Sequence, residues 1–419
     1  MSRAQSDLSV WAEKTAMAGL LASAAVASIG LALKETAILV AILAWLIHKS
    51  ASRTAPLSSA AWPLGLWFLA GIISVAHTVN MHASVQGLLK MLKIIGIVLV
   101  AADCIRTKPR LEALVAAMLI GASLICVDAF VQGLRGYDIW RHFSTGEAPG
   151  GLRRLTAGYG HANDLAAGLV SMFPACLAVA LSDLRVSYRR WAQGLVLALS
   201  AIFVLTFSRS GALGLAVGLF VFCVVRRAWK TLAGLTVFAA VGWMNLPAPI
   251  KAWVAEQPSW IYVLVQPLRL EIWQAAINMI KAHPVIGVGV NTFVLNYAHY
   301  KIPSDAIQAS YAHNQYLHMA AEIGLLGLAM FAWLLTRTFG VWRRLLAHPD
   351  ADVRLMAVGL GCGLVAFCVI GLLESALYSS RFVYVWLWMG TLFGMATTGS
   401  GSGTIPVPAT RNEQRSSHG

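Results

Sequence analysis

Charged residues are scarce in this sequence. Only 12% of its 419 residues are Asp, Glu, Lys or Arg, whereas 58% are hydrophobic. Soluble globular proteins carry about 25% charged residues, so this composition argues against a soluble fold. Apolar runs of about 20 residues recur along the whole chain, which is typical of polytopic helical membrane proteins.

Acidic residues and cysteines are scarcer still. The 18 Asp and Glu face 32 Lys and Arg, which gives a formal net charge of +14. Such an excess can indicate nucleic-acid binding, but the basic residues form short clusters between apolar runs, and membrane topology explains that pattern better. The six cysteines form no CxxC pair and no cluster with zinc spacing. We therefore expect neither disulfides nor a metal site, and expect these cysteines to be small packing residues.

About twelve membrane spans account for the apolar runs. If the N-terminus lies inside, every inner loop is basic, and both termini are cytoplasmic. The polar loop 133–160 and the long loop 246–313 then face outward. The predicted fold class is an all-α polytopic membrane protein, with a transmembrane domain at 1–398 and a disordered cytoplasmic tail at 399–419. The spans are predicted at 15–33, 36–48, 60–79, 84–105, 111–132, 161–182, 191–207, 212–225, 229–246, 314–335, 353–374 and 382–397.

Arg209 lies in a short outer connection between two predicted spans, TFSRSGA at 206–212. A charged group at this depth is costly unless it is paired or faces water. The planar guanidinium suits phosphate oxygens, and the hydroxyls of Ser208 and Ser210 and the N-terminus of the next helix can approach the same anion. The alternative is an arginine that snorkels to lipid headgroups.

The long outer loop contains a short amphipathic helix that starts near Arg269 and ends before Pro284. Residues 268, 272, 275, 276 and 279 share its apolar face, and the helix is too short and too polar to span a membrane. Glu256 and Glu271 are candidate partners for Arg269. The pattern alone leaves a surface salt bridge and a functional arginine equally open.

His313 stands where the long loop enters the next span. A histidine at the start of a helix that faces water can titrate near neutral pH and act as a general base. The alternative is an interfacial histidine bonded to backbone. Tyr311 and Asn314 are its neighbours, and Glu322, one helical turn after His318, lies at membrane depth and needs a partner.

Lys90 and Lys93 lie three residues apart inside the predicted fourth span. Two like charges on one helix face are costly in a membrane. Either both snorkel to the interface or they line a cavity that holds an anion. Asp128, near the outer end of the fifth span, is a candidate counter-ion.

Four stretches, in this order, resemble the O-antigen ligase and O-antigen polymerase superfamily of bacterial envelope glycosyltransferases. The resemblance covers most of the chain from residue 158 onward. It is strongest to O-antigen ligase, since many protein-glycosylating members carry a long soluble C-terminal extension that this sequence lacks. The stretches are GYGHANDLAA at 158–167, TFSRSGA at 206–212, the R-x-x-x-W stretch at 269–273 leading to HPVIGVGVNTF, and HNQYLHMAAEIGLLG at 313–327.

The resemblance implies a helical bundle in the bacterial inner membrane, with a large periplasmic loop over the active site. It also implies a glycan on undecaprenyl diphosphate as donor, lipid A–core as acceptor, and no metal or other cofactor. The family's arginines correspond to Arg209 and Arg269, and its loop histidine to His313. O-antigen polymerase and protein O-oligosaccharyltransferase remain open. A lipid-linked glycan transporter is disfavoured because the sequence shows no clear internal repeat.

We therefore expect a metal-independent, inverting glycosyltransferase. Arg209 and Arg269 would hold the donor diphosphate, and His313 would take the proton of the acceptor hydroxyl. The expected substrate-binding residues are Lys90, Lys93, Arg153, Arg154, Ser208, Ser210, Tyr311, Asn314 and Glu322.

Overall fold

The structure of the protein is a computed structural model that describes residues 3–27, 30–52, 59–148, 151–245, 247–302, 311–375 and 382–397. The predicted tail at 399–419 lies outside these residues. Within them the fold is helical apart from one antiparallel pair of strands, β1 (Gly146–Ala148) and β2 (Leu152–Arg154). The predicted all-α class is confirmed.

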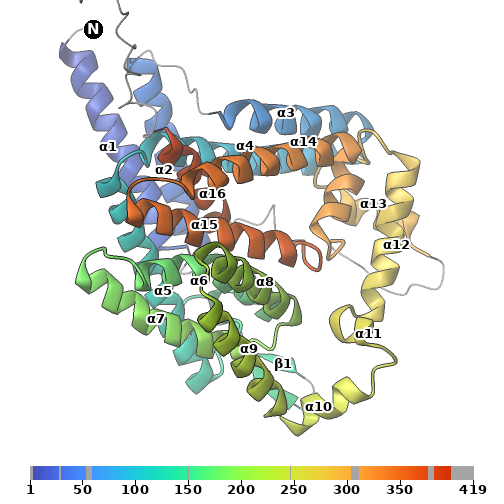
Figure 1. Cartoon of the computed structure of the whole chain (residues 1–419). Helices are drawn as coiled ribbons and strands as arrows, with labels where there is room; N and C mark the ends of the chain where they lie inside the picture. Colours follow the sequence, from blue (N-terminus) through green and yellow to red (C-terminus); the bar gives the residue numbers. More distant parts are fainter. Residues whose placement is uncertain are drawn as a thin grey trace, which may run out of the picture.

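Each of the twelve predicted spans coincides with a helix of the bundle (Figure 1). The largest differences are at the first span, where the helix begins twelve residues early, and at the tenth, where it continues ten residues further. The helices are α1 (Arg3–Ala25), α2 (Leu31–Ser52), α3 (Ala61–Ser74), α4 (Met81–Cys104), α5 (Lys108–Arg135), α6 (Ala162–Ala180), α7 (Val186–Val204), α8 (Arg209–Arg226), α9 (Trp229–Met244), α14 (Gln315–Leu345), α15 (Ala351–Ile370) and α16 (Val383–Ala396).

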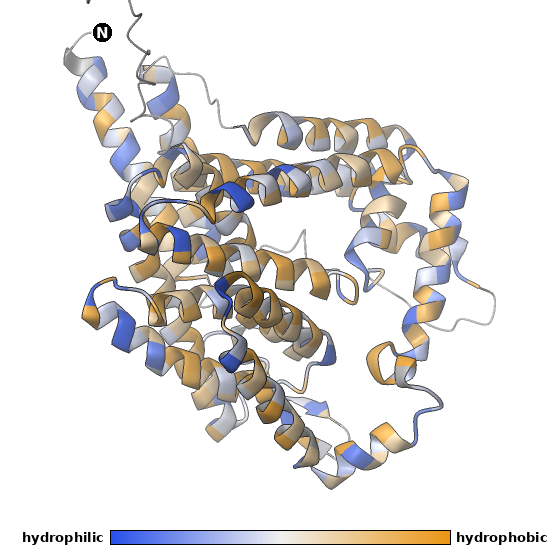
Figure 2. Cartoon of the chain, viewed as in Figure 1, coloured by the Kyte–Doolittle hydropathy of each residue, from blue (hydrophilic) through white to orange (hydrophobic). Residues whose placement is uncertain are grey.

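The bundle has the surface of a multi-pass membrane protein. In the described residues, six helices are long and apolar enough to cross a membrane, namely α4, α5, α6, α8, α14 and α15. Apolar residues cover the bundle helices, and polar residues gather toward the helix ends (Figure 2). Large apolar side chains such as Leu197, 74% exposed, point outward, as expected for a surface that faces lipid. All six cysteines are free thiols.

Helices α6, α8 and α15 pack closely because small residues line their contacts. A Cβ added to Gly218 of α8 would lie 2.8 Å from the Cβ of Ala366 in α15, and one added to Gly359 of α15 would lie 2.6 Å from the Cβ of Ala178 in α6. In lipid, close packing rather than hydrophobic burial holds helices together. This contact brings the N-termini of α6 and α8 to the end of α15.

The polar loop between α5 and α6 is anchored by buried side chains of α5. The carboxylate of Asp128 accepts the backbone N–H groups of Ile139 and Gly158 at 2.8 and 2.7 Å. The expectation that Asp128 neutralises Lys90 and Lys93 is therefore wrong, because the loop backbone engages both of its oxygens. Lys93 instead pairs with Glu35 of α2 at 2.7 Å, and the anchored loop presents the β1–β2 hairpin to the bundle.

The long loop between α9 and α14, predicted to face outward, folds into an arc of four helices at one end of the bundle, on the right in Figure 1. The predicted amphipathic helix is α12, and Ile272, Ala275, Ala276 and Met279 on its apolar face are buried. Leu268, predicted on the same face, is 47% exposed because the buried face begins one turn later. The four helices are α10 (Ala248–Ala255), α11 (Trp260–Leu264), α12 (Pro267–Ala282) and α13 (Phe293–Tyr300).

Helix α14 is broken at Ile323 and Gly324, and the turn after α12 enters the break. The backbone N–H of Val288 donates to the carbonyl of Ala321 at 2.9 Å, and the N–H of Leu325 donates to the carbonyl of Pro284 at 2.8 Å. These bonds satisfy backbone groups that the interrupted helix leaves open. Residues 312–322 share a small core with α12 and α13, and we call these three segments the lid.

The turn between α12 and α13, residues 283–292, is called the lid turn. Gly324→Ala is expected to detach it from the break in α14. Gly324 has φ +71°, and a Cβ there would collide with the carbonyl of Val285. Such a clash in a strained position costs about 2–3 kcal/mol of unfolding free energy. Gly340→Ala on the same helix is the control, since its Cβ would meet no atom within 4 Å. Thermal unfolding of both purified variants checks this, and equal midpoints would contradict the docked turn.

Candidate active site

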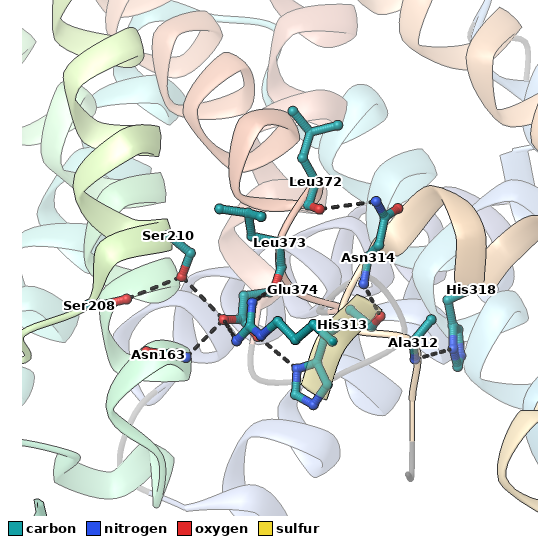
Figure 3. Close-up of polar contacts among 12 residues, drawn as sticks. Asn163, Ser208, Ser210, Ala312, His313, Asn314, His318, Leu372, Leu373 and Glu374 are labelled. Atoms are coloured by element: carbon teal, nitrogen blue, oxygen red, sulfur yellow. Dashed lines mark hydrogen bonds and ion pairs between the residues drawn. The ribbon is translucent and has the colours of Figure 1, made fainter. Parts of the chain in front are cut away.

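The carboxylate of Glu374, just after α15, is the centre of a polar cluster at the end of the bundle where α15 ends (Figure 3). Its side chain is only 10% exposed. Oε1 accepts from Arg269 Nη2 at 2.9 Å, from Asn163 Nδ2 at 2.8 Å and from Ser210 Oγ at 3.2 Å. Oε2 lies 3.3 Å from His313 Nδ1. One carboxylate therefore connects α6, α8 and the lid.

This carboxylate is ionised at neutral pH. Burial alone would raise the pKa of Glu374, but the hydrogen bond to His313 and the positive charge of Arg269 outweigh it and lower the pKa below its usual value. A lowered folded-state pKa means that the stabilising contribution is present above the unfolded pKa and is lost as the pH falls through the folded value.

Arg269, in the first turn of α12, joins the lid to the bundle. Nη2 pairs with Glu374, and Nη1 donates to the carbonyl of Leu373. The prediction that Arg269 pairs with Glu256 or Glu271 is therefore wrong. The first turn of α12 faces the connection after α15, so the guanidinium meets that connection rather than acids in its own loop.

Arg209 is the first residue of α8 and is covered by the outer loop. Ser208 caps the helix, with its Oγ accepting the N–H of Gly211 at 3.2 Å. The guanidinium of Arg209 lies 4.8 Å from the ring centroid of Trp253, and its Nη1 donates to the carbonyl of Val263. Helices α10 and α11 thus cover the outer side of Arg209.

Arg154, on β2, adds a third guanidinium to the cluster. Its Nη2 donates to Asn163 Oδ1 at 2.9 Å and its Nε to the carbonyl of Thr206 at 2.7 Å. Burial lowers the pKa of Arg154, and the charge of Glu374 opposes that shift. Arg153 is exposed on the opposite face of the strand, so of this predicted pair only Arg154 contacts the cluster.

His313 has a strained backbone that its neighbours hold in place. Its φ is +48°, a value that residues other than glycine rarely adopt. On the C-terminal side, Asn314 Nδ2 donates to the carbonyl of Leu372 at 3.0 Å, and its Oδ1 accepts the N–H of Tyr316 at 3.0 Å, which caps α14. The ring of Tyr311 lies edge-on to His313, 5.2 Å between centroids.

The other predicted residues lie apart from Glu374. Lys90 Nζ donates to Asn291 Oδ1 at 2.9 Å, and Glu322 Oε1 accepts the N–H of Phe293 at 3.0 Å. Lys90 and Glu322 therefore contact the lid turn, whereas Lys93 pairs with α2.

Sequence reasoning missed Glu374 and Asn163 as site residues. One feature of the sequence could have indicated Glu374, because it is an acidic residue at the end of an apolar run. Asn163 stood inside the GYGHANDLAA stretch.

The cluster has the charge and geometry to act on an anion. Arg154 and Arg269 lie close enough to Arg209 to repel it, and Glu374 is the acidic group that attracts it. The three guanidinium groups carry three positive charges and Glu374 carries one negative charge, so these four groups have a net charge of two positive charges in the described part of the site. No group of three or more His, Cys, Asp or Glu in the described residues is arranged to hold a metal ion.

Residues 194–332 match the family model described as O-antigen ligase. Across this segment the chain is similar to the O-antigen ligase and polymerase superfamily. The matched region contains Arg209, Arg269 and His313, whereas Asn163 and Glu374 lie outside it. A search of curated proteins finds no match. This similarity supports a glycosyltransferase-like, O-antigen ligase-like or polymerase-like role in the synthesis of bacterial envelope glycans.

Proposed function

We propose that this protein is an O-antigen ligase that transfers a glycan from undecaprenyl diphosphate to a sugar of lipid A–core, at the periplasmic face of the inner membrane. The observation that carries the proposal is the charge balance around Glu374. Three guanidinium groups surround one carboxylate, and the diphosphate of a lipid-linked glycan carries a negative charge on each phosphate. A bound donor would neutralise the cluster.

Arg209 and Arg269 hold the diphosphate and stabilise the charge that grows on it as the anomeric C–O bond breaks. A phosphate oxygen replaces the carbonyl of Val263 as the acceptor for Arg209, because hydrogen bonds to charged oxygens are stronger. Ser208 and Ser210 offer hydroxyl donors at the same helix start. Arg153, Arg154 and Lys90 add positive potential for the donor or for phosphates of the acceptor, whereas the charge of Lys93 is balanced by Glu35.

His313 activates the acceptor. Glu374 holds the proton of the neutral ring on Nδ1, so that Nε2 is the proton acceptor. As the sugar hydroxyl oxygen attacks the anomeric carbon, its proton passes to Nε2, the bond to the diphosphate breaks, and undecaprenyl diphosphate leaves. Glu374 then stabilises the imidazolium, as a carboxylate does in hydrolase triads. Tyr311 and Asn314 shape the acceptor side, and Glu322 supports the lid turn.

Transfer is expected to be independent of metal ions, because the arginines supply the charge stabilisation that a divalent ion would otherwise provide. The purified protein should therefore transfer glycan at the same rate with and without EDTA. Inhibition by EDTA that added Mg²⁺ or Mn²⁺ reverses would contradict this mechanism.

Incubation of the purified, reconstituted protein with undecaprenyl-diphosphate glycan and lipid A–core tests the proposed function. A glycolipid of higher mass that requires the acceptor supports a ligase. A glycan ladder without acceptor would indicate a polymerase, and glycosylated Ser or Thr in an added peptide would indicate a protein O-oligosaccharyltransferase. Movement of the donor across vesicles without a new linkage would indicate a transporter.

A further inference from the structure

A second buried polar pair lies in the lid next to His313. His318 and Glu322 are one turn apart on α14, and their side chains are 10% and 2% exposed. His318 Nε2 lies 3.5 Å from Glu322 Oε1, and the backbone N–H of Ala312 donates to His318 Nδ1 at 3.4 Å. In Figure 3, Ala312 and His318 lie to the right of His313, and Glu374 lies to its left.

These contacts fix the tautomer of His318. Since Nδ1 accepts the N–H of Ala312, the proton of the neutral ring is on Nε2, which faces Glu322. The same carboxylate oxygen accepts the N–H of Phe293 at 3.0 Å, so Glu322 is itself held by the start of α13. The imidazole therefore connects a fixed carboxylate to one backbone amide.

That amide belongs to the residue before His313. A backbone at φ +48° costs free energy and persists only when its surroundings hold it from both sides. Asn314 supplies the hold on the C-terminal side, through the carbonyl of Leu372 and the hydroxyl of Ser375 at 3.2 Å. On the N-terminal side, His318 holds the backbone N–H of Ala312.

We infer that His318, oriented by Glu322, is a positioning residue that holds His313 in reach of Glu374. This inference rests on the proposed role of His313 as the base. His318 acts through the backbone of Ala312. Without an acceptor at Nδ1, Ala312 relaxes, φ of His313 returns toward negative values, and the imidazole leaves Glu374.

Three substitutions separate positioning from packing. His318→Asn places an amide oxygen near the former Nδ1, where it accepts the N–H of Ala312. His318→Gln places its amide near the former Nε2, and His318→Leu has no acceptor. The expected order of kcat is wild type, then Asn, Gln and Leu, with a loss of about 10²-fold in the Leu variant and an unchanged KM for the lipid-linked donor. Equal losses in the Asn and Leu variants would overturn the inference.

Hydrogen exchange of the Ala312 amide tests the anchor without relying on activity. Exchange is expected to be fast in His318→Leu, slow in His318→Asn, and unchanged in the control His299→Leu, which alters an exposed histidine of α13. Unchanged exchange in His318→Leu would refute the anchor. If the Leu variant exchanges fast but transfers at the wild-type rate, the anchor has no part in transfer. If the wild-type protein shows no transfer, the proposed function fails, and the exchange result still decides the anchor.

Discussion

Arg209→Lys and Arg269→Lys are each expected to lose about 10³-fold in glycan transfer, nearly as much as the alanine variants. Arginines that stabilise phosphoryl charge contribute on this scale. Lysine keeps the charge but loses the planar fork of donors that two phosphates, or a phosphate and Glu374, can share. Rates with purified protein, undecaprenyl-diphosphate glycan and saturating lipid A–core check the result.

The lysine variants are more informative than the alanine variants at position 269. Arg269 bonds both to Glu374 and to the carbonyl of Leu373, and the pair is 11% and 10% exposed. Removing the cation leaves a buried carboxylate without its ion pair, which destabilises the fold as well as the site. Arg135→Lys, an exposed arginine at the outer end of α5, is the control and should transfer normally. Full activity in Arg209→Lys would refute bidentate binding of the diphosphate.

Glu374→Gln is expected to lower kcat by about 10²–10⁴-fold without raising the KM for the donor. The glutamine oxygen can still accept from Arg269, Asn163 and Ser210, so its NH₂ group faces His313 Nδ1. An N–H donor there forces the imidazole proton onto Nε2, and the base loses its free lone pair. Losing the carboxylate beside a catalytic histidine costs up to about 10⁴-fold in a serine protease for the same reason.

Donor binding separates this effect from general disruption. Glu374→Gln removes a negative charge from a cluster of arginines, so the lipid-linked donor should bind at least as tightly as to the wild type. Glu256→Gln alters an exposed acid near α10 and is the control with unchanged kcat. A wild-type kcat in Glu374→Gln would mean that Glu374 does not set the tautomer of His313.

The bundle helices and α12 could be predicted from the sequence because local patterns determine them. Continuous apolarity predicts the bundle helices, and helical periodicity predicts α12. Arg209 was also accessible, since its short connection between two helices is a local feature.

Contacts between segments far apart in the sequence could not be predicted from local patterns. The partner of Arg269 is Glu374, 105 residues later in the chain, so nearer acids looked equally suitable. The break in α14 has the same origin. Apolar residues continue through Gly324, and the helix breaks there because a turn from another part of the chain binds in the gap.

The anomeric configuration of the new linkage tests the central claim most directly. Wild-type protein is incubated with a lipid-linked donor of known configuration and lipid A–core, and the glycolipid is purified for NMR. One displacement, with His313 as base and the diphosphate held by Arg209 and Arg269, predicts a product linkage of inverted configuration. A retained configuration would contradict this account, because it requires two displacements and a covalent glycosyl intermediate.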